Sequence, residues 1–171
     1  MIRVELTQRE VDLASFVAEQ RNGAGAAAGA DALKYGDSGL SQYELHVRGC
    51  LGELAAAKGL DRYWAGGGTN YHEDLDLGIA QVRTTRYATG RLLIRPEEVR
   101  RKTIDDPWIL VIQHDPWHYG LAGWIIGREG IRDEYLTAVA GRKPAYFIPQ
   151  ERLKSFRIAA WLHPQLMERN A

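Results

Sequence analysis

The most uniform apolar run in the chain is Trp-Ile-Leu-Val-Ile-Gln, at residues 108–113. A continuous run of this length, rich in β-branched residues, is typical of a strand that is covered on both faces. Asp115 and Pro116 predict a turn, and residues 118–126 predict a second strand joined by it. Two shorter apolar stretches predict further strands, at 92–95 and 145–148. The centre of the fold is therefore expected to be a β-sheet.

The clearest helix signal lies over residues 41–59, where Ser41 and Glu44 have the spacing of a capping box. The expected core stripe of this helix consists of Leu45, Leu51, Leu54 and Ala55. Gly49 and Gly52 each weaken a helix by up to about 1 kcal/mol relative to alanine. Their presence predicts close packing of this helix against another element, such as a sheet.

An earlier helix is predicted over residues 7–21, where Thr7 and Glu10 form another capping box. The other segments predict, in order, an irregular Gly/Ala-rich connection (22–39), a short strand (60–65), strand material (74–87), a helix (128–140), a helical turn (149–153) and a helical segment interrupted at Pro164 (155–169). In an alternative for the first of these, Ala26 to Ala28 extend a helix. This order predicts an α/β (α+β) fold with a central mixed sheet flanked by helices. We expect a single domain over 1–171, with its core at about 41–150 and additions at 7–21 and 150–170.

Composition places the chain among ordinary globular proteins. It has 171 residues, of which 45% are hydrophobic and 26% charged, so disorder is not the expected state. No apolar run approaches the roughly 20 residues of a membrane span, and the first ten residues lack a secretion signal pattern. Cys50 is the only cysteine, which excludes an internal disulfide. These features predict a cytoplasmic protein without a membrane partner.

Charge is balanced over the whole chain but not locally. The formal net charge is zero, which argues against a strongly basic coat protein for nucleic acids. Between Arg83 and Lys102, however, seven basic side chains face two acidic ones, an excess of five. An acidic group precedes them, at Glu73, Asp74 and Asp76. This arrangement suits a metal ion beside a polyanion, although two solvated loops of uneven charge would produce the same pattern.

Candidate chemistry gathers around Asp76-Leu-Gly-Ile-Ala-Gln81-Val-Arg83. Side chains alternate along a strand, so Gln81 and Arg83 share one face. Asp76 has the wrong parity for a straight strand, but a bend at Gly78 would bring its carboxylate to the same side. A second acid, Glu53, comes from the helix over 41–59. In the plain alternative, Glu53 is an ordinary exposed helix residue and Asp76 caps a turn. Gln81 and Arg83 then form a solvated strand face.

The helix segment Gly-Cys-Leu-Gly-Glu-Leu-Ala-Ala-Ala-Lys (49–58) and the strand Gln-Val-Arg-Thr-Thr (81–85) resemble motifs of the PD-(D/E)XK, or restriction-endonuclease-like, nuclease superfamily. The resemblance covers about residues 41 to 126 and extends to small phage and prophage proteins with "QVRTT" and "GWI" strands. Asp76, Gln81 and Arg83 fall on the family's Asp, Glu/Asp and Lys positions. The resemblance implies that the chain has a restriction-endonuclease-like core and that it is a phage-encoded protein of the bacterial host cytosol.

The resemblance also implies an activity, the metal-dependent hydrolysis of DNA phosphodiester bonds. Glu53, Asp76 and Gln81 would bind Mg²⁺ or Mn²⁺, and Arg83 would take the place of the catalytic lysine. Further basic side chains are expected to hold the DNA backbone without reading its sequence, namely Arg86, Arg91 and Arg95. A homodimer is a possible assembly, because such enzymes often cut both strands.

Two departures from the family pattern support an alternative. Gln81 lacks the negative charge that Mg²⁺ favours, and Arg83 stays protonated, so that it clamps phosphate but does not act as a base. The alternative is a catalytically inactive nucleic-acid-binding or regulatory protein of the same fold, and a third hypothesis is an unrelated, protein-facing role. His46 and His72 are weaker site candidates, for which structural or solvated roles are favoured. Cys50 is expected to be buried rather than nucleophilic.

Overall fold

The structure is a computed structural model that describes residues 1–27, 39–66, 75–99, 103–138 and 143–156. Its main sheet contains β1 (Ile2–Glu5), β5 (His118–Ile126), β4 (Pro107–Gln113) and β2 (Gln81–Thr85), in that order. β1 and β4 pair antiparallel with β5, whereas β2 pairs parallel with β4. The predicted mixed α/β architecture with a mixed sheet is therefore confirmed.

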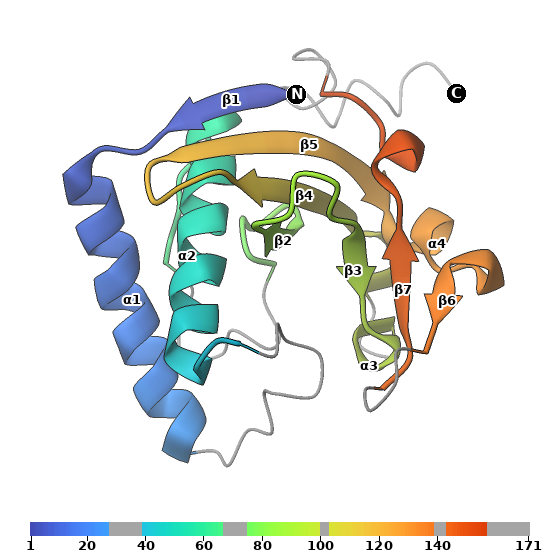
Figure 1. Cartoon of the computed structure of the whole chain (residues 1–171), viewed down its shortest axis with the longest axis horizontal. Coiled ribbons are helices and arrows are strands. Elements are labelled where there is room, and N and C mark those ends of the chain that lie inside the picture. Colours follow the sequence, from blue (N-terminus) through green and yellow to red (C-terminus); the bar gives the residue numbers. More distant parts are fainter. Residues whose placement is uncertain (28–38, 67–74, 100–102, 139–142, 157–171) are drawn as a thin grey trace.

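A second, smaller sheet packs against one face of the main sheet (Figure 1). It contains β3 (Leu92–Ile94), β7 (Ala145–Ile148) and β6 (Leu136–Thr137), all antiparallel. Short helical segments precede or follow these strands along the chain, namely α3 (Pro96–Val99), α4 (Gly127–Gly130) and 3₁₀ turns at Thr103–Asp105, Asp133–Tyr135 and Gln150–Arg152. The sequence predicted a single central sheet, so this division into two sheets is a finding of the structure.

Two long helices lie on the opposite side of the main sheet: α2 (Gln42–Gly59) packs against the strands, and α1 (Gln8–Ala27) packs against α2 (Figure 1). α2 begins at the predicted capping box, in which Ser41 Oγ accepts the Glu44 N–H at 3.2 Å. The backbone N–H of Ser41 in turn donates to a Glu44 carboxylate oxygen at 2.7 Å. Thr7 and Glu10 form the equivalent pair of bonds at the start of α1. No helix in the described ranges is long and apolar enough to cross a membrane.

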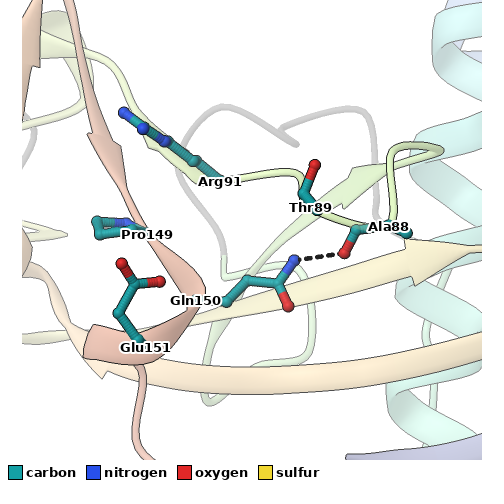
Figure 2. A pocket seen from close by; sticks show the side chains of 6 residues that line it. All are labelled: Ala88, Thr89, Arg91, Pro149, Gln150 and Glu151. Carbon is teal, nitrogen blue, oxygen red and sulfur yellow. Dashed lines mark hydrogen bonds between the residues drawn. The ribbon is translucent and has the colours of Figure 1, made fainter.

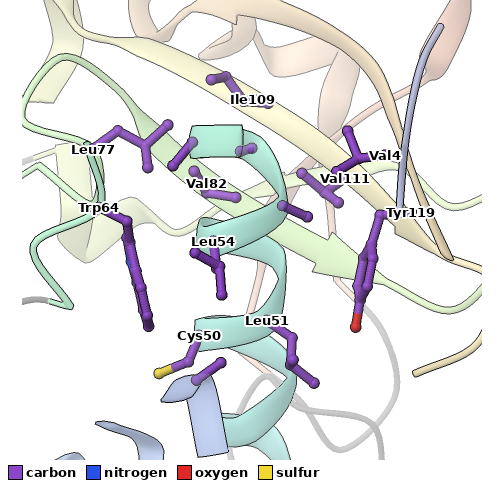
Figure 3. Close-up of a cluster of buried hydrophobic side chains, with 14 of the residues drawn as sticks. Val4, Cys50, Leu51, Leu54, Trp64, Leu77, Val82, Ile109, Val111 and Tyr119 are labelled. Carbon is purple, nitrogen blue, oxygen red and sulfur yellow. The ribbon is translucent and has the colours of Figure 1, made fainter. Parts of the chain in front are cut away.

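Strand β4 lies between two hydrophobic clusters. Ile109 and Val111 point toward the helices, into the larger cluster, which Figure 3 shows around Leu54 of α2. Trp108 and Leu110 point toward the second sheet. Both faces of the strand are covered, which explains why its apolar residues run without interruption. α2 and β2 approach each other closely at Gly52, where an added Cβ would overlap the Thr84 side chain.

Three local predictions from sequence were wrong. Residues 60–65 do not form a strand, because they turn back on the end of α2: Asp61 has a φ of 52° and the Arg62 N–H donates to Ala57 O at 2.8 Å. Residues 128–140 do not form one helix, because the described part, up to residue 138, contains no fully buried side chain beyond Gly130. α1 extends beyond residue 21 into the segment that was expected to be irregular.

β1 was not predicted, although the alternation of Ile2 and Val4 with charged residues is a strand signal. Most of the terminal segment predicted to be helical, 155–169, lies outside the described residues, as does most of the 22–39 connection.

Candidate functional site

Glu53 is the one buried charged residue among those described, with 5% of its surface exposed. It lies in the second half of α2, directly after the Gly52 that packs on β2. Arg21 of α1 binds it with two hydrogen bonds, from Nη1 to Oε1 at 2.8 Å and from Nη2 to Oε2 at 2.7 Å. The indole N–H of Trp64 donates to Oε2 at 3.1 Å. Both carboxylate oxygens of Glu53 are therefore engaged.

Sequence reasoning missed Arg21, although a signal was available. Ala14 and Ala18 are fully buried on α1, and Arg21 follows them at helical spacing on the same stripe. A charged residue in line with buried alanines needs a buried partner, since an unpaired charge is costly in the interior. The Arg21 side chain is 11% exposed and that of Glu53 7%, so the pair joins α1 to α2 away from solvent.

Asp76 lies in the turn that leads into β2, and the bend expected at Gly78 is present, with a φ of 70°. An Asp76 carboxylate oxygen accepts the backbone N–H of Val82 at 2.7 Å. Burial and the nearby negative charge of Glu53 raise the pKa of Asp76 to about 7, while Arg83 opposes the rise. The two acids that the sequence singled out therefore lie close enough to repel each other.

Arg83 extends over the face of β2 opposite α2. Its guanidinium lies 4.7 Å from the centre of the Trp108 ring, donates to Val82 O at 2.8 Å, and forms an ion pair with Glu98 of α3. It also lies 3.8 Å from the Asp76 carboxylate. Gln81 starts the same strand on the same face, half-buried. The structure thus brings Asp76 and Arg83 together, but fixes the guanidinium by contacts that the sequence did not predict.

The donor atoms do not fit a divalent cation in the arrangement observed. Across the described parts of the chain, no three His, Cys, Asp or Glu side chains are grouped so that they could hold a metal ion. With Asp76 ionised, the carboxylates of Glu53, Asp76 and Glu98 exceed the guanidinium groups of Arg21 and Arg83 by one negative charge. The two guanidinium groups therefore carry together the same positive charge that one divalent metal ion would bring.

The basic residues expected to bind DNA are not equivalent. Arg86 and Arg91 lie exposed at the two ends of the β2–β3 loop (residues 86–91), which contains no acidic residue. Tyr87 of the loop is 54% exposed, and Arg86 lies over its ring at 5.3 Å. Arg95 is half-buried, and its backbone N–H donates to Glu98 at 2.9 Å. Of these three arginines, which all lie in the described residues, only the two at the ends of the loop are exposed.

One residue from a distant part of the sequence holds this loop in place. Gln150 Nε2 donates to Ala88 O at 2.8 Å, as Figure 2 shows, and to Gly90 O at 2.9 Å, so two loop carbonyls point toward it. Gln150 and the loop also line an open hollow of about 310 Å³, with Arg91 on one side and Glu151 on the other. The loop is thus ordered by the chain that follows β7.

Two other candidates on α2, Cys50 and His46, lie within electrostatic range of Arg21 and Glu53. Burial raises the pKa of the Cys50 thiol to about 12, so its predicted burial is confirmed and it is a poor nucleophile. His46 is half-buried on α2, and burial lowers its pKa. The residues His72, Glu73, Asp74 and Arg100–Lys102 lie outside the described residues.

Comparisons with known proteins found no relative: no family model matches the chain, and no curated protein or solved structure does.

Proposed function

We propose that this protein binds the phosphate backbone of nucleic acid through the β2–β3 loop, without metal-dependent cleavage. The observation that supports binding is the exposed, acid-free loop between Arg86 and Arg91, with Tyr87 exposed beside them. Arginine side chains bind phosphate oxygens through paired N–H donors, and an exposed aromatic ring stacks on bases. Gln150 draws two carbonyl oxygens of the loop toward itself, which keeps these negative dipoles away from an approaching phosphate.

The state of Glu53 supports the absence of cleavage. Phosphodiester hydrolysis of the family type needs carboxylates that hold a hard cation, and the cation supplies charge neutralisation and an activated water. Here Arg21 and Trp64 engage both Glu53 oxygens, and Gln81 adds no charge. On this proposal the chain resembles the nuclease superfamily in the order and placement of its motif residues. Arg21 then takes the place of the family's metal ion, and Arg83 that of its lysine.

Binding is tested by fluorescence anisotropy with labelled single-stranded and duplex DNA over a range of salt concentrations. Arg91→Ala is expected to weaken binding and to lower the salt slope by about 0.9 for duplex DNA, the loss of one phosphate contact. Arg3→Ala is the matched control, because Arg3 is exposed on β1, at the opposite edge of the main sheet from β2. Absence of binding at low salt, or equal effects of the two variants, would refute the proposal.

A second candidate, the metal-dependent nuclease predicted from sequence, is favoured by the proximity of Glu53, Asp76 and Arg83 at the start of β2. Arg83 would clamp the phosphate, since its guanidinium stays protonated. The test is nicking of supercoiled plasmid with Mg²⁺ or Mn²⁺, compared between the unaltered protein and Asp76→Asn. Metal-dependent nicking that the variant loses would establish this candidate and overturn the non-hydrolytic part of the first proposal.

A further inference from the structure

The guanidinium of Arg21 is seated among oxygen atoms. Its Nη2 lies 2.7 Å from Glu53 Oε2 and 2.9 Å from the backbone carbonyl of Gly66, and its Nη1 lies 2.8 Å from Glu53 Oε1. The side chains of the pair are 11% and 7% exposed, so water neutralises little of their charge. Three oxygens from two separate segments thus converge on one buried cationic group.

Carboxylate and backbone carbonyl oxygens are also the ligands of hard cations such as Ca²⁺, Mn²⁺ and the lanthanides. Ca²⁺ binds such oxygens at about 2.3 to 2.6 Å, slightly closer than the nitrogen–oxygen distances observed here. The carboxylate of Asp76 adds a second negative charge within electrostatic range of both Glu53 and Arg21. The place that the guanidinium occupies therefore has the oxygen chemistry and the charge of a cation site.

We propose that Arg21 is a built-in counter-cation that closes a hard-cation site formed by Glu53 and the Gly66 carbonyl, with Asp76 supplying additional charge. In the native chain the guanidinium excludes divalent ions from these oxygens. When its charge is removed, the same oxygens bind a metal ion. The inference goes beyond nucleic-acid binding and does not depend on it, because it concerns an ion on the protein alone.

The primary test compares the unaltered protein with Arg21→Met by Tb³⁺ luminescence and by calorimetry with Mn²⁺. Trp64 donates a hydrogen bond to Glu53, so it lies close enough to sensitise the emission of a Tb³⁺ ion bound there. We expect the variant to bind Tb³⁺ and Mn²⁺ on the order of ten-fold more tightly or better. Trp64→Phe in that background should reduce sensitised emission, while calorimetry still detects the ion.

Two matched variants distinguish ion binding at this site from a general effect of the more negative net charge. Arg21→Lys keeps a positive charge at the same place and should stay closed to the ion. Arg21→Met combined with Glu53→Gln should lose the binding gained by the single variant. Equal ion binding by the unaltered protein and Arg21→Met, or binding that survives Glu53→Gln, would overturn the proposal.

Loss of Arg21 leaves Glu53 without a charged partner, and the variant can fail to fold for that reason alone. Arg21→Gln, which retains hydrogen-bond donors, provides a second variant without the charge. Circular dichroism with and without Mn²⁺ then gives the decisive measurement, because an ion that binds only the folded state stabilises it. Refolding or a higher Tm in Mn²⁺ supports the proposal, and two variants indifferent to Mn²⁺ refute it, whatever the DNA-binding assay shows.

Discussion

Replacement of Gly52 by alanine tests whether α2 must approach β2 this closely. A Cβ built on Gly52 overlaps Thr84 Oγ1, and lies 2.8 Å from Thr84 Cβ and 2.9 Å from Thr84 Cγ2. Rotation about χ1 of Thr84 moves Oγ1 and Cγ2 but leaves its Cβ in place. The helix or the strand must therefore shift to accommodate one methyl group.

The magnitude follows from comparison with a second glycine on the same helix. Gly49 has no atom within 4 Å of a built Cβ, so Gly49→Ala gains only helix propensity, about 0.5 to 1 kcal/mol. Gly52→Ala gains the same propensity but overpacks the interface, which costs about 1 to 3 kcal/mol. Because the propensity gain cancels between the two variants, their difference in unfolding free energy isolates packing. The contact with Thr84 Cβ, which no rotation about χ1 relieves, places this difference at about 2 to 3 kcal/mol.

Urea unfolding monitored by tryptophan fluorescence measures this difference. With a slope of about 2 kcal/mol/M for a chain of this size, the two midpoints should differ by about 1 to 1.5 M. Thr84→Ala removes the hydroxyl and the methyl group but keeps the Cβ, so it should recover only part of the loss in a Gly52→Ala background. Equal midpoints for Gly49→Ala and Gly52→Ala would show that the helix–strand contact is looser than the structure has it.

Three further predictions concern buried and ordered polar groups. Arg21→Met or Glu53→Gln should each cost about 3 to 5 kcal/mol of unfolding free energy, and replacing both residues with methionine should cost less than the sum, measured as a double-mutant cycle in urea. Because the folded state raises the pKa of Asp76 from 3.8 to about 7, protonation of Asp76 stabilises the fold at low pH, and this stabilisation is lost as the pH rises between these values. The total loss of unfolding free energy has an upper limit of about 4 kcal/mol. Asp76→Asn should remove this pH dependence, as measured by thermal unfolding at several pH values. Gln150→Ala should cost about 1 kcal/mol and weaken DNA binding without changing the salt slope, because no charge is removed; a changed slope would contradict this account.

Local signals in the sequence predicted much of the secondary structure. The capping boxes at Thr7 and Ser41 predicted the starts of both long helices, because a cap depends only on residues three apart. The apolar run of β4 predicted a strand covered on both faces. The segment 128–140 failed because helix propensity without an apolar face to bury does not hold a helix together.

The candidate site was likewise predicted only in part from the sequence. The sequence alone singled out Glu53, Asp76, Gln81 and Arg83 as candidates, and the bend at Gly78 beside Asp76 was also predicted. The bonds of Arg21 to a residue 32 positions away, and those of Gln150 to the β2–β3 loop, could not be predicted from local spacing.

Sequence by itself thus determined where the two long helices begin, which apolar run forms the strand covered on both faces, and which side chains are chemically suited to a site. Tertiary structure alone decided which charges those side chains meet, because such contacts depend on the packing of distant segments. The consequence is largest at Glu53: its position in the sequence is compatible with a metal ligand, and the packing of α1 against α2 places a guanidinium on it instead. Electrostatic energy in a buried place depends on separations of a few ångströms, which only the folded chain sets.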